Sequence, residues 1–168
     1  GGSYEYLKDE GMGGRNLDAR THFYYFATVN TPAMTWKLIG AGSQYAWGYL
    51  DAQGNILDGG KSYKMNLPKD APANRFISIC VYDSQTRSML QTDQPFPSYN
   101  SKRDKNKFIT NEDGSVDLYF GPTPPENQEA NWIQTVPGKG WLCLLRLYDP
   151  TEPWFDKTWK PGEITLVD

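Results

Sequence analysis

Two long apolar runs constrain the fold of this chain more than any other feature. They are NRFISICVYD, residues 74–83, and GWLCLLRLYD, residues 140–149. Each run is rich in aromatic and aliphatic side chains, and each ends in a tyrosine followed by an aspartate. Apolar runs of this kind, bounded by turn residues, are typical of buried strands. We therefore expect a mainly β fold in which both runs form central strands.

Shorter strand candidates surround these two runs. From Gly42 onward the hydrophobic pattern shifts towards a period of two, which favours strands. The further candidates are GSQYAWGYL, KSYKMNLP, SVDLYFG, WIQTV and EITLV. About eight to ten short strands joined by turns predict an antiparallel β-sandwich or jelly roll.

Two acidic loops are predicted to be turns and not calcium sites. In DAQGNILD, residues 51–58, Gln53 stands where a calcium loop needs an anionic oxygen, and no glutamate closes the loop. The second loop, NEDG at residues 111–114, follows a short strand candidate at Phe108 to Thr110 and has the composition of a glycine turn. We expect a hairpin turn at both places.

The N-terminal quarter of the chain has a different pattern. Residues 1–16 are glycine-rich and polar and predict a flexible or docking arm. Residues 17–42 predict one or two short helices, with Pro32 tolerated in a first turn and Gly40 placed to end the last one. Residues 43–168 would form the jelly-roll domain. The chain starts without an initiator methionine, so we expect a fragment or a processed product.

Composition excludes several classes of partner. The net charge is −3 and no basic stripe is present, which argues against nucleic-acid binding. No window is apolar over the length that a bilayer requires, so we expect no membrane span.

Cys80 and Cys143 both lie in strand-like apolar runs, where free buried thiols are favoured over a disulfide. We also expect no cofactor.

His22 is the only histidine of the chain. A histidine-based metal site cannot be built from one such side chain, so no metal site is expected. A serine or cysteine nucleophile would have to recruit the same residue as its base. We favour a structural or surface role for His22.

The first apolar run breaks abruptly into a polar stretch, residues 80–101, that holds Asp83, Arg87 and Asp93. Arg146 lies within the second apolar run, where an arginine is rarely buried without a carboxylate partner. One interpretation is an ion-pair network that fixes the long connection at residues 84–107. The other is a catalytic carboxylate pair, or an arginine site for a carboxylate or a sugar. The structural interpretation is favoured.

Aromatic residues make up 14% of the chain, with six tryptophans and eleven tyrosines. Such side chains suit β-sheet cores and also surfaces that stack on flat ligands or sugar rings. The candidate ligand-binding rings are Trp132, Trp154 and Trp159, of which the last two flank a charged turn. A packed lid over the sandwich is the default interpretation, and stacking on a glycan is the alternative.

Several long motifs occur in one order along the chain. They are GSQYAWGY, DGGKSYKMNLP, VYDSQTRSMLQTDQPFPS, NEDGSVDLYFGP, ANWIQTVPGKGW and EPWFDKTWKPGEI. Together they closely resemble the domain-of-unknown-function 1214 family, over nearly all of the chain from Leu17 to Ile164. The resemblance implies a β jelly roll and an N-terminal companion, domain-of-unknown-function 1254. It also implies exported or envelope-associated bacterial proteins, with the cell envelope, periplasm or extracellular space as the compartment, and no catalytic residue.

Three functional hypotheses remain open at this point. The first is a non-enzymatic module that packs on a companion domain or chain and can bind a glycan or a small polar ligand. The second is a hydrolase or lyase in which Asp83 or Asp93 acts as acid or base while an arginine, Arg87 or Arg146, holds an anionic group. The third is a structural subunit of a homo-oligomeric assembly, with the glycine-rich arm docked on a neighbour.

Overall fold

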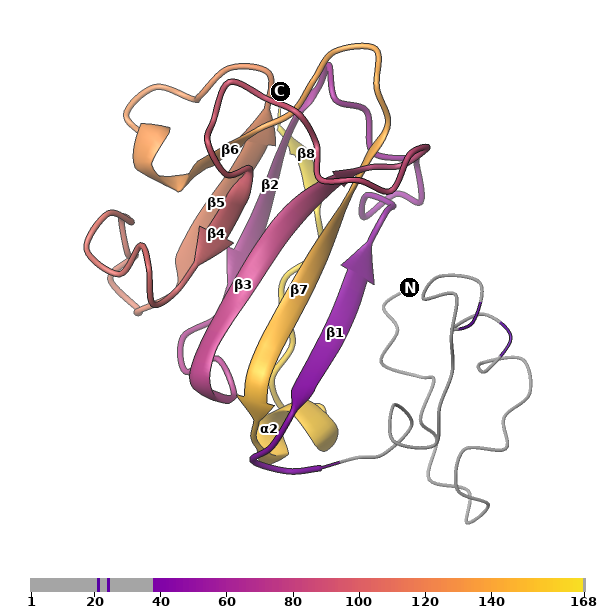
Figure 1. The fold of residues 1–168 in the computed structure, drawn as a ribbon. Coiled ribbons are helices and arrows are strands. Elements are labelled where there is room, and N and C mark those ends of the chain that lie inside the picture. Colours follow the sequence, from indigo (N-terminus) through magenta and orange to yellow (C-terminus); the bar gives the residue numbers. More distant parts are fainter. Residues whose placement is uncertain (1–20, 22–23, 25–37, 168) are drawn as a thin grey trace.

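The computed structural model describes residues 21, 24 and 38–167. They form a sandwich of two four-stranded β-sheets (Figure 1). The first sheet has the order β1 (Ser43–Gly48), β7 (Trp141–Pro150), β3 (Ala73–Asp83) and β4 (Ser98–Asn100). The second sheet has the order β6 (Trp132–Gln134), β5 (Val116–Gly121), β2 (Ser62–Leu67) and β8 (Thr165–Val167). All strand pairs are antiparallel except β5 with β6, which is parallel. The predicted mainly β sandwich is confirmed.

The two long apolar runs are the central pair of the first sheet, as predicted. β3 pairs with β7 from Phe76 opposite Tyr148 to Asp83 opposite Trp141, and β7 pairs with β1 on its other side. Alternation along each strand sends one set of side chains into the sandwich and the other outward. The continuous apolar character of β7 arises because its outward leucines, Leu142 and Leu144, are also buried.

The core lies between the sheets. Trp141 is fully buried there, stacked on Phe120 at 4.9 Å between ring centroids and in edge contact with Tyr63 at 5.6 Å. Full burial of one large apolar side chain stabilises a fold by roughly 1.5–3 kcal/mol. The other inward side chains of the paired strands are Ala46, Met65, Leu67, Ile77, Ile79, Val81, Leu118, Ile133, Cys143, Leu145 and Leu147.

Most connections cross from one sheet to the other. The chain passes between sheets after β1, β2, β4, β6 and β7, whereas β3–β4 and β5–β6 stay within one sheet. The predicted turn after β1 is present, because one Asp51 carboxylate oxygen accepts hydrogen bonds from the backbone N–H groups of Gln53 and Asn55 at 2.9 and 2.8 Å. The turn is closed by an isolated bridge between Leu50 and Ile56, and the strands on either side belong to different sheets.

Some details of the sequence prediction differ from the structure. Residues 108–110 form no strand, so the glycine turn at 111–114 leads into β5 without a hairpin partner. β4 was not predicted, because it is only three residues long. The predicted arm at 1–16 and His22 lie outside the described residues. Of the predicted helical segment at 17–42, the structure describes residues 21, 24 and 38–42, and residues 38–42 form turns and bends instead of a helix. Two short helices appear elsewhere, η3 (Glu129–Asn131) and α2 (Glu152–Phe155).

Both cysteines are free thiols, as predicted. Cys80 lies opposite Leu144, and Cys143 lies opposite Val81, so adjacent register positions put the two side chains on opposite faces of the sheet. Cys143 points into the core, where burial raises its pKa to about 12. Cys80 points outward and is only partly buried.

Candidate functional site

Asp83 stands at the C-terminal end of β3 and holds two loops together. Its carboxylate accepts hydrogen bonds from the backbone N–H groups of Gln85 and Thr86 at 2.8 and 3.1 Å. It also pairs with the Lys139 ammonium group at 2.7 Å. The Lys139 bond and the two backbone donors lower the pKa of Asp83 to about 2. With only 6% of its surface exposed, Asp83 is a structural anion that ties residues 84–88 to the β6–β7 turn.

Arg87 follows in the same turn. Its backbone N–H donates to the Asp83 carbonyl at 2.8 Å, and its φ of 59° is in the left-handed region.

The ion pair of Asp83 with Lys139 bridges 56 positions along the chain. Sequence reasoning missed Lys139 because a lysine in the turn PGKG carries no signal for so distant a partner.

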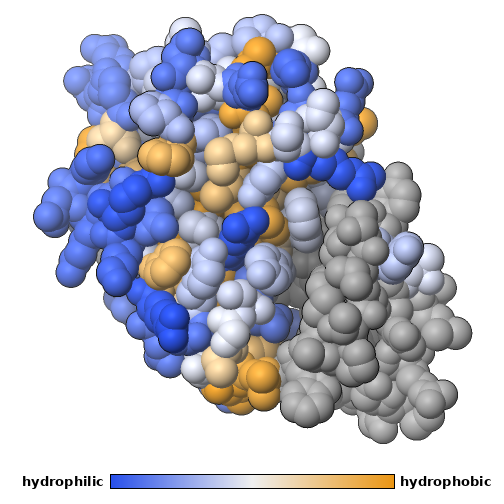
Figure 2. Space-filling view, viewed as in Figure 1, coloured by the Kyte–Doolittle hydropathy of each residue, from blue (hydrophilic) through white to orange (hydrophobic). Residues whose placement is uncertain are grey.

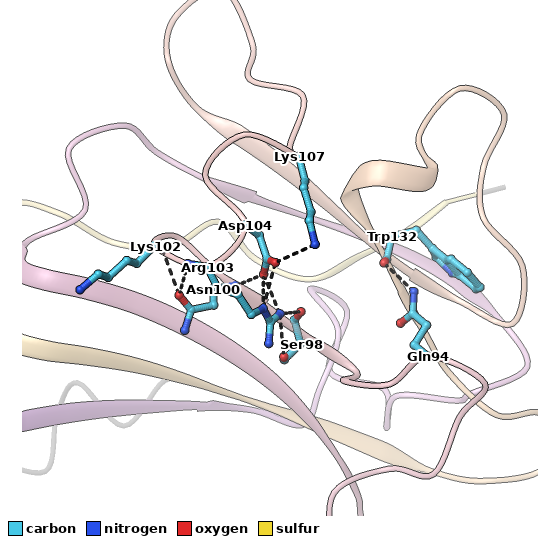
Figure 3. Close-up of polar contacts among 8 residues, drawn as sticks. All are labelled: Gln94, Ser98, Asn100, Lys102, Arg103, Asp104, Lys107 and Trp132. Carbon is cyan, nitrogen blue, oxygen red and sulfur yellow. Dashed lines mark hydrogen bonds and ion pairs between the residues drawn. The ribbon is translucent and has the colours of Figure 1, made fainter.

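Asp93 lies at the surface, beside the edge of the second sheet. Its backbone N–H donates to the side-chain oxygen of Gln134, and its carboxylate accepts from the Gln134 amide at 3.1 Å. Gln94 completes this attachment. Its amide donates to the Trp132 carbonyl at 3.1 Å (Figure 3), and its side-chain oxygen accepts from the Gln134 N–H at 2.9 Å. Asp93 therefore helps to dock the 84–97 connection onto β6.

Arg146 does not join these carboxylates. It lies opposite Ser78, five positions along β3 from Asp83, which is roughly 17 Å at the rise of a strand. The two side chains also lie on opposite faces of the sheet. Asp83 is on the inward face, in alternation with Ile79 and Val81, whereas Arg146 is on the outward face. The structure thus does not assemble the four candidate residues into one cluster.

Arg146 instead contacts tyrosines on the outward side of the first sheet. Its Nη2 donates to the Tyr82 hydroxyl at 2.9 Å, and its guanidinium lies 5.9 Å from the centre of the Tyr45 ring. Its Nε is buried without a hydrogen-bond partner. Burial lowers the pKa of Arg146, but Tyr148, Tyr82 and Cys80 raise it more, so the net shift is upward. A buried donor without a partner costs about 1–3 kcal/mol, which marks this position as unusual.

The three candidate tryptophans lie apart. Trp154 and Trp159 belong to the core cluster, with 6% and 7% of their surfaces exposed. The Trp159 indole donates to the Lys69 carbonyl at 3.1 Å. Trp132 lies on β6, where its indole donates to the Gly121 carbonyl at 2.9 Å. Two of the three rings therefore have almost no surface for stacking on a sugar.

The outward side of the first sheet carries a set of aromatic and aliphatic side chains around Arg146. We call this set the β3–β7 outer face; it comprises Tyr45, Trp47, Phe76, Ser78, Cys80, Tyr82, Leu142, Leu144, Arg146 and Tyr148. In the space-filling view, orange, white and pale-blue residues surround a strongly hydrophilic spot in the middle of this side, and further strongly hydrophilic residues gather at its left margin (Figure 2). Phe76 and Tyr148 stack on each other at 4.2 Å between centroids.

Two exposed apolar side chains border this face. Met89 pairs with Tyr82 through an isolated bridge and is 43% exposed. Phe96, which is 61% exposed, lies under the Arg103 guanidinium at 5.3 Å. Exposed apolar groups that adjoin a half-buried aromatic surface are typical of interaction sites.

A cationic turn lies beside Phe96. Asp104 is buried at its centre and accepts hydrogen bonds from Arg103 and from the Asn100 N–H, while Lys107 approaches it at 3.8 Å (Figure 3). Arg103 also donates to the Ser98 carbonyl at 2.9 Å, which fixes the turn to β4. The turn residues 101–107, SKRDKNK, carry four basic residues and one acidic residue.

The outward side of the second sheet is chemically different. Lys64 and Asp117 form an ion pair at 2.8 Å, and Asn66 donates to the same carboxylate at 2.7 Å. Tyr119 lies beside Lys64, whose ammonium group is 5.8 Å from the ring centre. We call this the polar outer face.

The structure holds no clear metal site in the part that it describes. Among residues 21, 24 and 38–167, no three His, Cys, Asp or Glu side chains converge as a metal site would require. None of the described helices has the length and apolar character to span a membrane.

The chain belongs to the family described as Protein of unknown function (DUF1214), whose model matches residues 42–152. The resemblance inferred from the sequence motifs is therefore confirmed. A search of curated proteins gives no match.

The solved structures that resemble this chain include the following two proteins. The VPA0106 protein of Vibrio parahaemolyticus shares its fold, with a TM-score of 0.66 and 21% identity over 90% of this chain and 35% of that chain. An uncharacterized protein from Burkholderia cenocepacia aligns with a TM-score of 0.49 and 16% identity over 99% of this chain and 47% of that chain. This chain thus spans about a third of the length of the Vibrio protein.

Proposed function

We propose that this chain is a non-enzymatic β-sandwich module that binds a companion domain or chain through the β3–β7 outer face. The observation that carries this proposal is the position of Arg146 among half-buried aromatic side chains, with exposed Met89 and Phe96 at the border. Interfaces are enriched in aromatic residues, methionine and arginine, and depleted in other charged residues at their centre.

The carboxylates argue for a binding module over the hydrolase or lyase alternative. Asp83 is held by Lys139 and two backbone donors, and a pKa of about 2 keeps it ionised, which makes it a poor general acid or base near neutral pH. Asp93 is bound to Gln134 at the edge of the other sheet. The two carboxylates serve separate loop attachments.

The share of the Vibrio structure that this chain covers supports a companion domain. About two thirds of that protein lies outside the matched part, so the fold occurs there within a longer chain. We extend the proposal to an exported or envelope-associated protein in which the sandwich packs against a companion of this kind. A homo-oligomeric assembly would use the same face, and light scattering on the native protein separates the two arrangements.

Site-specific photo-crosslinking tests this proposal. A benzoylphenylalanine is placed at Phe96, beside the β3–β7 outer face, or at Tyr119 on the polar outer face, and the protein is irradiated in the cells that produce it. We expect a discrete crosslinked product from position 96 and none from position 119. Crosslinking from 119 alone would overturn the assignment of the face.

A glycan is the second ligand class for the same module. The Phe76–Tyr148 stack, Tyr82 and Tyr45 are rings of the β3–β7 outer face that a glycan would contact. Tyrosine and tryptophan fluorescence is followed during titration with a panel of neutral and acidic oligosaccharides. A flat response across the panel would exclude this ligand class.

A further inference from the structure

We infer that Arg146 is a carboxylate-recognition residue, and that the β3–β7 outer face takes an acidic, partly apolar protein segment. This inference rests on the proposed function and specifies the partner's chemistry. It comes from the one arginine on the described surface that combines a central position, partial burial and only uncharged partners.

The other paired cations of the described chain have carboxylates. Arg75 pairs with Asp149 at 2.6 Å, Lys64 with Asp117, Lys139 with Asp83, and Arg103 with Asp104. No carboxylate of the described residues lies within ion-pair distance of Arg146, whose contacts are tyrosine side chains. A guanidinium is permanently charged and carries five donors, so two phenols leave both its charge and most of its donors unmatched.

The surroundings of Arg146 are arranged for an anion. Tyr82 and Tyr148 flank it with hydroxyl groups, which can donate to a carboxylate that the guanidinium binds. Arg146 is partly buried, and its guanidinium lies over the Tyr45 ring. Partial burial reduces screening by water, so a charge-assisted pair is stronger here than at an open surface. A planar guanidinium can bind both oxygens of one carboxylate.

The border of the face favours an acidic partner over a neutral one. The cationic turn contains Lys102, Lys105 and Lys107, whereas its single carboxylate, Asp104, is already engaged by Arg103 and approached by Lys107. Figure 3 shows Lys102 directed away from this ion-pair cluster. This local excess of positive charge occurs in a chain whose net charge is −3. Complementary charge at the rim speeds association, and an arginine near the centre sets specificity.

The apolar residues favour a protein segment over an acidic glycan. Met89 and Phe96 offer exposed apolar surface suited to aliphatic or aromatic side chains. The rings that a sugar would stack on are already partly used, since Phe76 and Tyr148 cover each other and Arg103 covers Phe96. The fitting partner therefore alternates Asp or Glu with apolar residues.

The test uses the full 168-residue chain and two synthetic peptides with blocked ends. The acidic peptide is Glu-Phe-Glu-Leu-Glu-Phe, and the matched neutral peptide replaces each glutamate by glutamine. Proton–nitrogen NMR follows the backbone amides of β3 and β7 together with the Nε–H signal of Arg146. We expect the acidic peptide to shift the Arg146 signal, with weaker binding at higher salt.

Variants then separate Arg146 from general positive charge. Arg146→Gln is expected to weaken acidic-peptide binding about tenfold or more, a change of about 1.4 kcal/mol. Arg146→Lys keeps the charge without the bidentate geometry and should lie in between. The matched control is Arg75→Gln, which removes an exposed arginine of the same sheet and should change binding less than about twofold. Melting curves verify that each variant is folded.

The possible results lead to distinct conclusions. If both peptides shift the β3 and β7 amides equally, or if Arg146→Gln binds as well as the wild type, carboxylate recognition is overturned while the binding face stands. If an oligogalacturonate shifts the Arg146 signal and the acidic peptide does not, the protein partner is overturned. If no probe shifts any amide of the face while crosslinking from position 96 succeeds, the inference fails and the proposed function survives.

Discussion

The two outer faces of this sandwich are built by the same alternation but handle their charges differently. On the polar outer face, Lys64, Asn66 and Asp117 satisfy one another through an ion pair and a hydrogen bond. On the β3–β7 outer face, Arg146 contacts only tyrosines among the described residues, and its buried Nε has no hydrogen-bond partner there. Polar groups that already pair with one another gain little binding energy from a partner protein. A cation among aromatic rings without a carboxylate gains much more, because a partner can supply that carboxylate. This difference is why we propose the first sheet as the interacting side.

The loops that border the two faces differ in their polar contacts, whereas exposed apolar side chains occur beside both, with Ile109 46% exposed beside the second sheet. Beside the second sheet, Asn131 is buried and its side chain bonds with the Ile109 N–H, the Ile109 carbonyl and the Asp117 carbonyl. Beside the first sheet, Met89 and Phe96 leave apolar surface in contact with water. The predictions below test whether the polar side stabilises the fold and the aromatic side serves binding.

The largest effect is expected at Asn131. Asn131→Leu removes three hydrogen bonds of a buried side chain and leaves backbone groups of Ile109 and Asp117 without these partners, so the free energy of unfolding should fall by about 3 kcal/mol or more. Urea denaturation followed by tryptophan fluorescence measures it. The exposed Asn106→Ala serves as the control, with a change within about 0.5 kcal/mol. A loss below about 1 kcal/mol for Asn131→Leu would contradict the account.

A smaller loss is expected on the polar outer face itself. Asp117→Ala removes the acceptor shared by Lys64 and Asn66, and should lower the free energy of unfolding by about 1 kcal/mol, because Lys64 is well exposed to solvent. The double variant with Lys64→Ala should cost less than the sum of the two single changes. Strict additivity would show that the ion pair does not contribute.

The Asp83 carboxylate should make stability depend on pH in a defined window. Its folded-state pKa of about 2 lies below the unfolded value near 3.9, so its contribution is present above about pH 4 and is lost as the pH falls towards 2. Asp83→Asn removes this contribution and should be less stable than the wild type at pH 7. The difference in the free energy of unfolding between the two proteins should shrink as the pH falls from about 4 towards 2. A difference that stays constant from pH 7 to pH 2 would rule out the pairing with Lys139 as its source.

The smallest effect on stability is expected at Arg146. Arg146→Gln removes a half-buried charge that has no carboxylate partner among the described residues. The relief of its unpartnered Nε should offset the loss of the hydrogen bond to Tyr82 and of side-chain packing, so the free energy of unfolding should change by no more than about 0.5 kcal/mol. Chemical denaturation of the two proteins in parallel provides the comparison. A loss above about 2 kcal/mol would mean that Arg146 stabilises the fold, and the contrast between the two outer faces would then break down.

Much of the fold could be predicted from the sequence because the strongest patterns come from the most buried strands. β3 and β7 are long, apolar and bounded by turns, and they form the central pair of the first sheet. β4 escaped prediction because SYN contributes one buried side chain, Tyr99, and its strand character comes from pairing with β3. Local pattern cannot reveal a strand that exists only through its neighbour.

The site was harder to predict because closeness in sequence differs from closeness in space. Asp83 and Arg87 suggested an ion-pair cluster, but the cation that pairs with Asp83 is Lys139, contributed by a distant turn. Arg146 and Tyr148 share a strand face because they are two positions apart, and that spacing alone predicted their common orientation. That Tyr82 also contacts Arg146 could be predicted only from the register between β3 and β7, and the sequence of one strand does not contain that register.

The central claim, that the β3–β7 outer face is the covered side of the native protein, is tested most directly by hydroxyl-radical footprinting. The native protein, purified from its own cells with its partners, is compared with the isolated 168-residue chain. We predict slower oxidation of Met89 and Phe96 in the native protein, with Tyr119 on the polar outer face oxidised at the same rate in both. Unchanged rates at Met89 and Phe96 together with a slower rate at Tyr119 would contradict the account.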